Sequence, residues 1–143
     1  MITETNNINQ LSFFTATILN WHNLLIDNKY KEIIIASLKY LTEKQKIKLS
    51  AFVIMPNHIH LVWKLNNRLK LQDIQRDFLK FTAQSIKKDL LINHKNILKK
   101  FYVGLKDREY QFWQRNPLTV ELYSEKVAIQ KIEYIHYNPV NEK

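Results

Sequence analysis

The chain has 143 residues, 45% of them hydrophobic, which is enough for one buried core and too few for two full domains. We therefore expect one globular domain over residues 1–143. Its 22 Lys and Arg against 13 Asp and Glu give a formal net charge of +9. Such a charge attracts polyanions, and nucleic acid is the leading candidate partner.

Scarce residue types exclude several kinds of chemistry. The absence of cysteine rules out disulfides and thiolate metal sites, so any metal must be held by nitrogen and oxygen ligands. Gly104 is the one glycine, so the chain has no glycine-rich phosphate loop. The first ten residues are polar, and no apolar run approaches the ~20 residues that span a bilayer. We expect a cytoplasmic protein without membrane contact.

A strand and a helix are predicted first. The segment LSFFTATILNW, residues 11–21, is rich in β-branched and aromatic residues, which is typical of a strand. Asp27 and Asn28 then offer capping side chains, and apolar residues recur at helical spacing up to about residue 45. The members of this apolar stripe are Tyr30, Ile33, Ile34, Leu38 and Leu41.

A hairpin is predicted next. Residues 46–55, KIKLSAFVIM, have the composition of a strand. Pro56 and Asn57 fit the two central positions of a tight turn, because Pro has a fixed φ and Asn tolerates an unusual one. Residues 58–65, HIHLVWKL, should therefore return as an antiparallel strand.

The second half of the chain predicts a helix, a strand and a last helix. The apolar stripe of the first of these helices consists of Leu71, Ile74, Phe78 and Phe81. The segment REYQFWQ, residues 108–114, is the predicted strand, and the last helix starts at Ser124 and stops near Pro139. This order of elements predicts an α+β fold, a ferredoxin-like (RRM-like) antiparallel sheet with flanking helices.

Two histidines stand one residue apart at the start of the third predicted strand. Side chains alternate along a strand, so His58 and His60 share a face with Val62 and Lys64, whereas the other face is wholly apolar. Two imidazoles placed in this way can bind one cation at ~2.0–2.2 Å. We interpret the pair as half of a metal site and expect neither ring to lie in the core.

The last predicted helix presents a phenol and an amide together. With Ile132 as the centre of its apolar stripe, Tyr134 falls on the opposite side at ~100° per residue, with Asn138 one turn further along. His136 falls on the apolar side, which predicts a core histidine. A phenol of pKa ~10 needs a nearby cation or base to act as a nucleophile, and a metal ion could polarise a phosphate for it. The helix pattern alone does not separate this role from that of an ordinary surface aromatic.

These motifs carry a family resemblance. The segments FVIMPNHIHLVW, FWQRN and IEYIHYNPV resemble the single-tyrosine HUH transposases, particularly the REP-associated and IS200-like tyrosine transposases. HUH denotes histidine-hydrophobic-histidine, here His58-Ile59-His60. The resemblance extends from the first strand to Val140. A bare His-x-His is weak evidence, but the histidine motif followed about seventy residues later by the tyrosine motif is specific.

The resemblance implies a fold of the HUH endonuclease type, a divalent metal and a covalent mechanism. The expected metal is Mg²⁺ or Mn²⁺, bound by His58 and His60 with Asn138 as third ligand at a position where relatives carry Gln. Tyr134 is the expected nucleophile, which attacks single-stranded DNA and leaves a 5'-phosphotyrosine and a free 3'-hydroxyl. The implied substrates are single-stranded or hairpin DNA, and related enzymes include homodimers that share active sites in trans.

Basic and aromatic residues interleave over residues 99–115, which is typical of a surface that binds single-stranded nucleic acid. Phe101, Tyr102 or Tyr110 could stack on bases there, whereas at least one of Phe112 and Trp113 should be in the core. The basic second helix could hold the backbone of a hairpin. The residues that we expect to contact DNA are Arg76, Lys80, Lys87, Lys88, Lys99, Lys100, Tyr102 and Arg115.

Two other functions stay open from the sequence. One is a non-catalytic nucleic-acid-binding module on the same fold, in which the histidines are vestigial or bind RNA. The other is a zinc hydrolase in which the histidines and a third ligand activate water, although no carboxylate base stands near the motif. Only a tyrosine transposase would form a covalent adduct with DNA.

Overall fold

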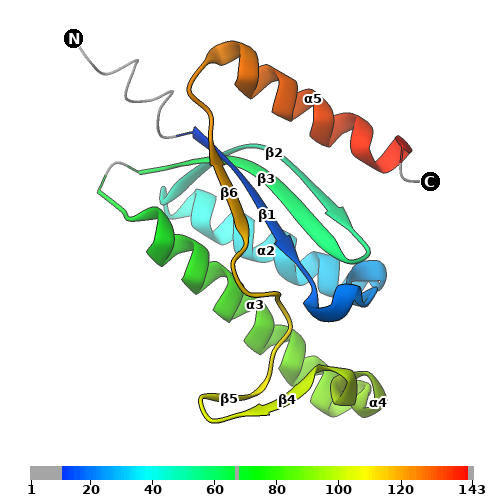
Figure 1. Ribbon diagram of the computed structural model, residues 1–143. Helices are drawn as coiled ribbons and strands as arrows, with labels where there is room; N and C mark the ends of the chain where they lie inside the picture. The colour runs from blue at the N-terminus through cyan, green and yellow to red at the C-terminus, as the bar shows by residue number, and fades with distance from the viewer. Residues whose placement is uncertain (1–10, 67, 142–143) are drawn as a thin grey trace.

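A four-stranded antiparallel sheet forms the centre of the computed structural model, which describes residues 11–66 and 68–141, with side chains to residue 137 (Figure 1). Its strands are β1 (Leu11–Thr17), β2 (Ile47–Met55), β3 (His58–Leu65) and β6 (Leu118–Glu121). They lie in the order β2-β3-β1-β6, so β1 and β3 occupy the middle. This order, with one long helix after β1 and another after β3, confirms the predicted ferredoxin-like fold.

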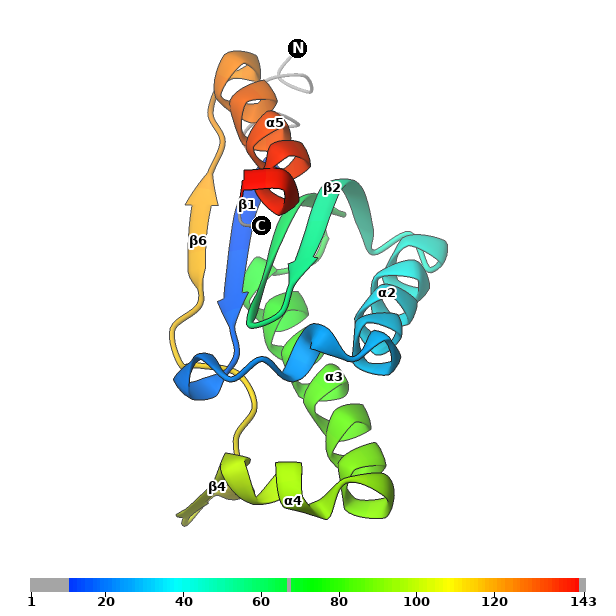
Figure 2. The same ribbon diagram turned by 90° about the vertical axis from the view of Figure 1, so that its right-hand side faces the viewer.

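Helices cover both faces of the sheet. The helices α2 (Asn28–Glu43) and α3 (Leu71–Asn93) pack on one face, and α5 (Glu125–Asn141) crosses the other (Figures 1 and 2). The predicted cap at Ser124 is present, since its hydroxyl accepts a hydrogen bond from the Val127 amide at 3.2 Å. The helix ends at Asn141, two residues beyond Pro139, which agrees with the expected stop near that proline. No helix in the described part of the chain has the length and apolar character needed to cross a membrane.

The sheet separates two hydrophobic cores. The larger core lies against α2 and α3, where Phe14 and Trp63 of the sheet meet Ile34 and Phe78 of the helices. The smaller core lies under α5, where Phe13 and Val62 are among the buried residues. The face that carries the two histidines is therefore covered by a helix, which the sequence pattern does not reveal.

A β-bulge at Ser50 lets β2 serve both cores. The register of β2 against β3 shifts between Leu49 and Ala51. Leu49 packs against the larger core, whereas Ala51 and Val53 lie in the smaller one, although all three positions are odd-numbered. One extra residue in a strand reverses the alternation beyond it, so the bulge supplies the small residues on which α5 packs.

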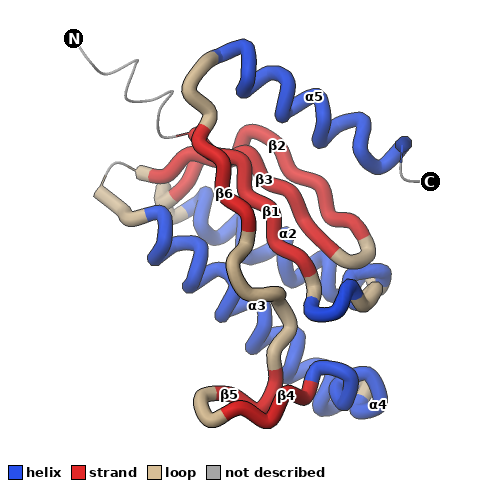
Figure 3. Tube along the Cα trace, in the orientation of Figure 1, coloured by secondary structure: helices blue, strands red, loops and turns tan. Residues whose placement is uncertain are grey.

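The fourth strand of the sheet is not the predicted one. Residues 108–114 contribute β5 (Arg108–Tyr110), which pairs with β4 (Tyr102–Leu105) in a separate hairpin (Figure 3), and Trp113, which forms an isolated antiparallel bridge with Ile18. The short helices α4 (Lys95–Leu98) and η3 (Lys99–Phe101) precede that hairpin. Phe112 and Trp113 are both buried, and the Trp113 indole donates a hydrogen bond to the Thr82 hydroxyl at 3.1 Å. Contact with α3, together with this short backbone pairing to the end of β1, therefore explains the apolar character of the segment.

Two other predicted elements have different limits. β1 ends at Thr17, and the rest of the predicted strand consists of Ile18 and the short 3-10 helix η1 (Leu19–Trp21). A second 3-10 helix, η2 (Leu24–Ile26), follows it. Phe81 is 55% exposed, so its assignment to the buried stripe of α3 is wrong. The stripe continues from Phe78 through Thr82, one full turn later, because four-residue steps keep to the side that faces the sheet.

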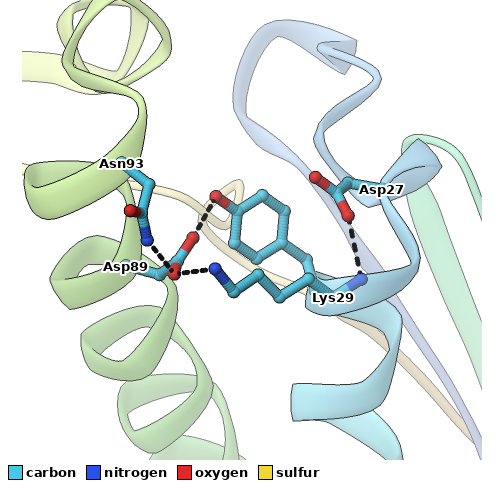
Figure 4. Close-up of polar contacts among 5 residues, drawn as sticks. Asp27, Lys29, Asp89 and Asn93 are labelled. Atoms are coloured by element: carbon cyan, nitrogen blue, oxygen red, sulfur yellow. Dashed lines mark hydrogen bonds and ion pairs between the residues drawn. The ribbon is translucent and has the colours of Figure 1, made fainter.

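A polar cluster joins α2 to α3 (Figure 4). The Asp89 carboxylate accepts a hydrogen bond from the buried Tyr30 hydroxyl at 2.7 Å and one from the Asn93 amide at 2.8 Å, and it pairs with Lys29. Burial raises the pKa of the Asp89 carboxyl, but its hydrogen-bond donors and the nearby ammonium outweigh burial and hold the pKa below its usual value. The cluster therefore keeps the carboxylate charged and fixes the two helices relative to each other.

Tyr30→Phe should lower the free energy of unfolding by about 1.5–3 kcal/mol, because it removes a hydrogen bond to a charged group. Since the pKa of Asp89 is lower in the folded state, its stabilisation is present above the unfolded value of ~3.9 and is lost as pH falls through the folded value. The variant should therefore lose less stability than the parent on acidification from pH 6 to pH 3. Urea denaturation measures both effects, with Tyr40→Phe at a 56% exposed position as control. Equal unfolding midpoints for the two variants would contradict the assignment.

Candidate active site

The two histidines lie on the face of β3 that α5 covers. His58 is half-buried next to the Pro56–Asn57 turn, and the rings of the two histidines are 4.8 Å apart between centroids. The prediction that they share a face is confirmed by the register of β3. The prediction that neither lies in the core is wrong for His60, which is only 7% exposed and stacks on Phe13 at 5.2 Å. The reason is α5, which closes over this part of the sheet.

Each imidazole is oriented through its Nδ1 atom. Thr15 lies opposite His60 in the register of β1 with β3, and its hydroxyl is 2.8 Å from His60 Nδ1. The Asn57 side-chain oxygen is 2.7 Å from His58 Nδ1. An amide oxygen only accepts hydrogen bonds, so His58 Nδ1 is the donor in this contact. A hydrogen-bonded Nδ1 of this kind fixes ring orientation in metal-binding histidines.

Burial keeps His60 neutral. It lowers the pKa of His60 to about 4, with further contributions from the positive charges of His58 and Lys131. Neutral imidazole is the form that binds a metal ion, because the proton competes for the same lone pair. His60 is therefore ready to act as a ligand across the physiological pH range.

Tyr134 stands beside the histidine pair. Its ring centroid is 5.4 Å from that of His60 and 6.2 Å from that of Phe13, and the side chain is 48% exposed. The prediction that Tyr134 points away from the packed side of the helix is thus wrong in angle. The buried positions of α5 are Ala128 and Ile135, not Ile132, which turns the stripe by roughly 60° and brings Tyr134 to its edge.

The same rotation exposes His136. It follows the buried Ile135 by one residue, roughly 100° around the helix and on the side away from Tyr134. The prediction of a core histidine is therefore wrong, and His136 takes no part in the site. The two errors have one cause, the choice of Ile132 as the centre of the stripe.

The residues present fit an incomplete metal site. Two imidazoles with centroids 4.8 Å apart are within the span of one ion bonded to each ring at about 2.1 Å. No group of three His, Cys, Asp or Glu that could hold a metal occurs in the described part of the chain. Asn138 lies on α5 one turn after Tyr134, but its side chain is outside the described residues. Imidazole nitrogen together with a neutral oxygen suits a transition-metal ion better than Mg²⁺, which prefers oxygen ligands.

Some of the residues expected to contact DNA meet at a groove of about 400 Å³ between α3 and the β4–β5 hairpin. Lys80 and Lys87, two turns apart on α3, face Arg108 and Tyr110 across it. The Lys87 ammonium lies 5.2 Å from the centre of the Tyr110 ring, and Tyr102 contacts that ring edge-on at 5.7 Å. Asp107 and Glu109 also line the groove, so its charge is mixed.

The other expected contacts lie elsewhere. Lys88 is exposed outside the groove, and Arg76 is exposed and pairs with neighbouring carboxylates. Phe101 is 1% exposed, so it is buried and does not present its ring for stacking. The predicted residues therefore do not form one continuous surface. Lys99, Lys100 and Arg115 are exposed, and the structure assigns them no common site.

Several residues of the site escape detection in the sequence. Thr15 and Phe13 belong to β1, and only the pairing of β1 with β3 shows that they meet His60. Lys131 precedes Tyr134 by three residues, a helical neighbour spacing that is the one available signal. These side chains support and surround the histidine pair.

Solved structures with this fold include transposases. The structure of the REP-associated tyrosine transposase bound to a REP hairpin has a TM-score of 0.68 and 19% sequence identity, and the match covers 94% of this chain and 68% of that one. A candidate transposase from Deinococcus radiodurans R1 has a TM-score of 0.59 and 17% identity, with 88% of each chain covered. At these identities the likeness establishes the shared fold.

The family is established by a sequence match that extends over nearly the whole chain. Residues 10–138 match the protein-family model described as transposase IS200 like, and the chain therefore belongs to the IS200-like transposase family. No match was found among the curated proteins. The family resemblance expected from the histidine and tyrosine motifs is thereby confirmed.

His60→Ala should reduce stability by about 1–3 kcal/mol, because it empties a buried position and removes the hydrogen-bond partner of Thr15. His58→Ala, at the half-buried position, should shift stability by less than about 1 kcal/mol. Chemical denaturation of the two variants measures the difference. A smaller effect at position 60 than at position 58 would show that α5 does not close over His60 in solution.

Proposed function

We propose that this protein is a metal-dependent single-stranded DNA endonuclease and transposase that cleaves and rejoins DNA through a 5'-phosphotyrosine intermediate. The observation that carries the proposal is the meeting of three side chains at the α5 face of the sheet. His58 and His60 stand 4.8 Å apart, and the half-exposed Tyr134 ring lies 5.4 Å from His60. Membership of the IS200-like transposase family supports the same chemistry.

Tyr134 is the proposed nucleophile. Its phenol oxygen attacks the phosphorus of a phosphodiester, a P–O bond to Tyr134 forms, and the bond from phosphorus to the 3' oxygen breaks. The phenol gives up its proton to solvent, and the leaving 3' oxygen takes one up, so the products are a 5'-phosphotyrosine and a 3'-hydroxyl. Rejoining is the reverse, in which a 3'-hydroxyl attacks the phosphotyrosine and releases the phenol.

His58 and His60 would hold a divalent ion, with the Asn138 amide as the proposed third ligand. When bound, Mn²⁺ or Mg²⁺ supplies a Lewis acid that polarises the phosphate. Asn57 and Thr15 hold the two imidazoles in the required orientation through Nδ1. The donor set favours Mn²⁺ as the metal to use in a test.

The proposed substrate is a single-stranded or hairpin DNA. The relative of known structure is bound to a REP hairpin, and the net charge of +9 suits a polyanion. Lys80 and Lys87 would contact phosphates in the groove beside the β4–β5 hairpin. Tyr110 lines this groove and Tyr102 contacts the Tyr110 ring, so both could supply rings for base stacking. The exposed Lys88, Lys99, Lys100, Arg76 and Arg115 would add contacts to the backbone.

Tyr134→Phe should abolish the covalent protein–DNA adduct while the variant still binds Mn²⁺ and DNA, because a ring without a hydroxyl cannot attack phosphorus. The measurement is a denaturing gel of labelled hairpin DNA incubated with protein and Mn²⁺, beside a reaction with a chelator. Tyr137→Phe is the matched control, since Tyr137 is 63% exposed on the same helix.

Two results would count against this assignment. If the adduct persists in Tyr134→Phe and disappears in Tyr137→Phe, the nucleophile is Tyr137 and not Tyr134. The absence of adduct with the unmodified protein, across a panel of hairpins that it binds, would instead support the non-catalytic nucleic-acid-binding module.

Replacing Lys80 and Lys87 together by Ala should weaken DNA binding and flatten its dependence on salt. Each lost phosphate contact on a single strand should reduce the log–log slope by roughly 0.7, because fewer counterions are released. Fluorescence anisotropy over a series of salt concentrations measures the slope. Lys39→Ala on α2 is the control, because Lys39 is exposed and lies outside the groove. An unchanged slope in the double variant would remove the groove from the DNA-binding surface.

A further inference from the structure

Lys131 turns toward the sheet although it carries a charge. Its ammonium lies 4.7 Å from the centre of the Phe13 ring and 5.9 Å from that of Tyr134, and the residue is half-buried. Other charged residues of α5, such as Lys126 and Glu133, are exposed. Lys131 therefore places a positive charge directly beside the nucleophile and the histidine pair.

No anion balances this charge within residues 11–66 and 68–137. None of the ion pairs among these residues includes Lys131, and its ammonium lies against the rings of Phe13 and Tyr134. An ammonium held against two aromatic rings and beside a pair of imidazoles that could bind a cation is unfavourable unless a negative ligand joins them.

We propose that Lys131 binds the non-bridging oxygens of the phosphodiester that Tyr134 attacks. This inference rests on the proposed function and adds a substrate-contacting residue to it. The phosphate is the anion that the site otherwise lacks. Lys131 lies next to both Tyr134 and the histidine pair, so one phosphate could contact the nucleophile, the ammonium and the proposed metal site together.

The ammonium has a defined part in the reaction. During attack by the phenol oxygen, negative charge gathers on the non-bridging oxygens while the bond to the 3' oxygen breaks. A fixed positive charge stabilises that state more than the ground state, since the charge there is larger. Lys131 neither gives nor takes a proton in this step, and it stays bound to the phosphate in the phosphotyrosine.

A structural role would be different. The methylene stem of Lys131 could simply cover Phe13, and in that case only its shape would count. Lys131→Met keeps an unbranched apolar stem and removes the charge, whereas Lys131→Arg keeps the charge. Lys126→Met, at an exposed position in the first turn of α5, is the matched control for loss of a charge.

The experiment measures adduct formation and metal binding on the full chain. In single-turnover reactions with labelled hairpin DNA and Mn²⁺, Lys131→Met should slow adduct formation by about 10²–10³-fold, and Lys131→Arg should retain most of the rate. Without DNA, titration calorimetry should show that Lys131→Met binds Mn²⁺ as tightly as the parent or more tightly, because a like charge has been removed. A methylphosphonate at the mapped cleavage position lacks the charged oxygen, so it should shrink the difference between parent and Lys131→Met.

The outcomes separate this inference from the proposed function. If the parent forms the adduct and Lys131→Met forms it at the same rate, the inference is overturned and the proposed function stands. If Lys131→Met loses adduct formation and Mn²⁺ binding together, Lys131 acts through the structure of the site and the inference is again overturned. If the parent forms no adduct on any hairpin, both fail.

Discussion

The antiparallel register of β1 against β3 is the constraint on which the site depends. It sets Thr15 opposite His60 and Phe13 opposite Val62, so the ring of His60 finds both a hydrogen-bond partner and a stacking surface on β1. A slip of one residue would turn every side chain of the strand to the other face. The larger core opposes such a slip, because Phe14 and Trp63 must remain buried on the α2 and α3 side.

The position of α5 converts a strand motif into a site. A sheet with one open face would expose the two histidines to water, where burial would not lower the pKa of His60. The bulge at Ser50 moves Ala51 and Val53 of β2 to that face, and Ala128 and Ile135 of α5 pack in the same core. The helix thus lies close enough for its flank to reach the histidine rings.

Local sequence patterns determined most of the framework. The hairpin of β2 and β3, with its turn at Pro56 and Asn57, follows from alternation and turn chemistry, and β3 starts at His58 as predicted. The caps at Asp27 and Ser124 mark the starts of α2 and α5 for a similar reason. These features depend on residues within a few positions of one another, so local sequence patterns predict them. The motif of two histidines on one face belongs to the same class.

Only the tertiary structure decided which residues meet across the chain. The rotation of α5 brings Tyr134 and Lys131 to His60 and leaves His136 outside, because packing of Ala128 and Ile135 on the sheet sets the angle of the helix. β6 and the burial of residues 112–113 likewise depend on partners in distant segments. The sequence by itself determined the histidine motif, the local elements and the candidate tyrosine. The geometry between them arose from packing between elements far apart in the chain, which no local pattern encodes.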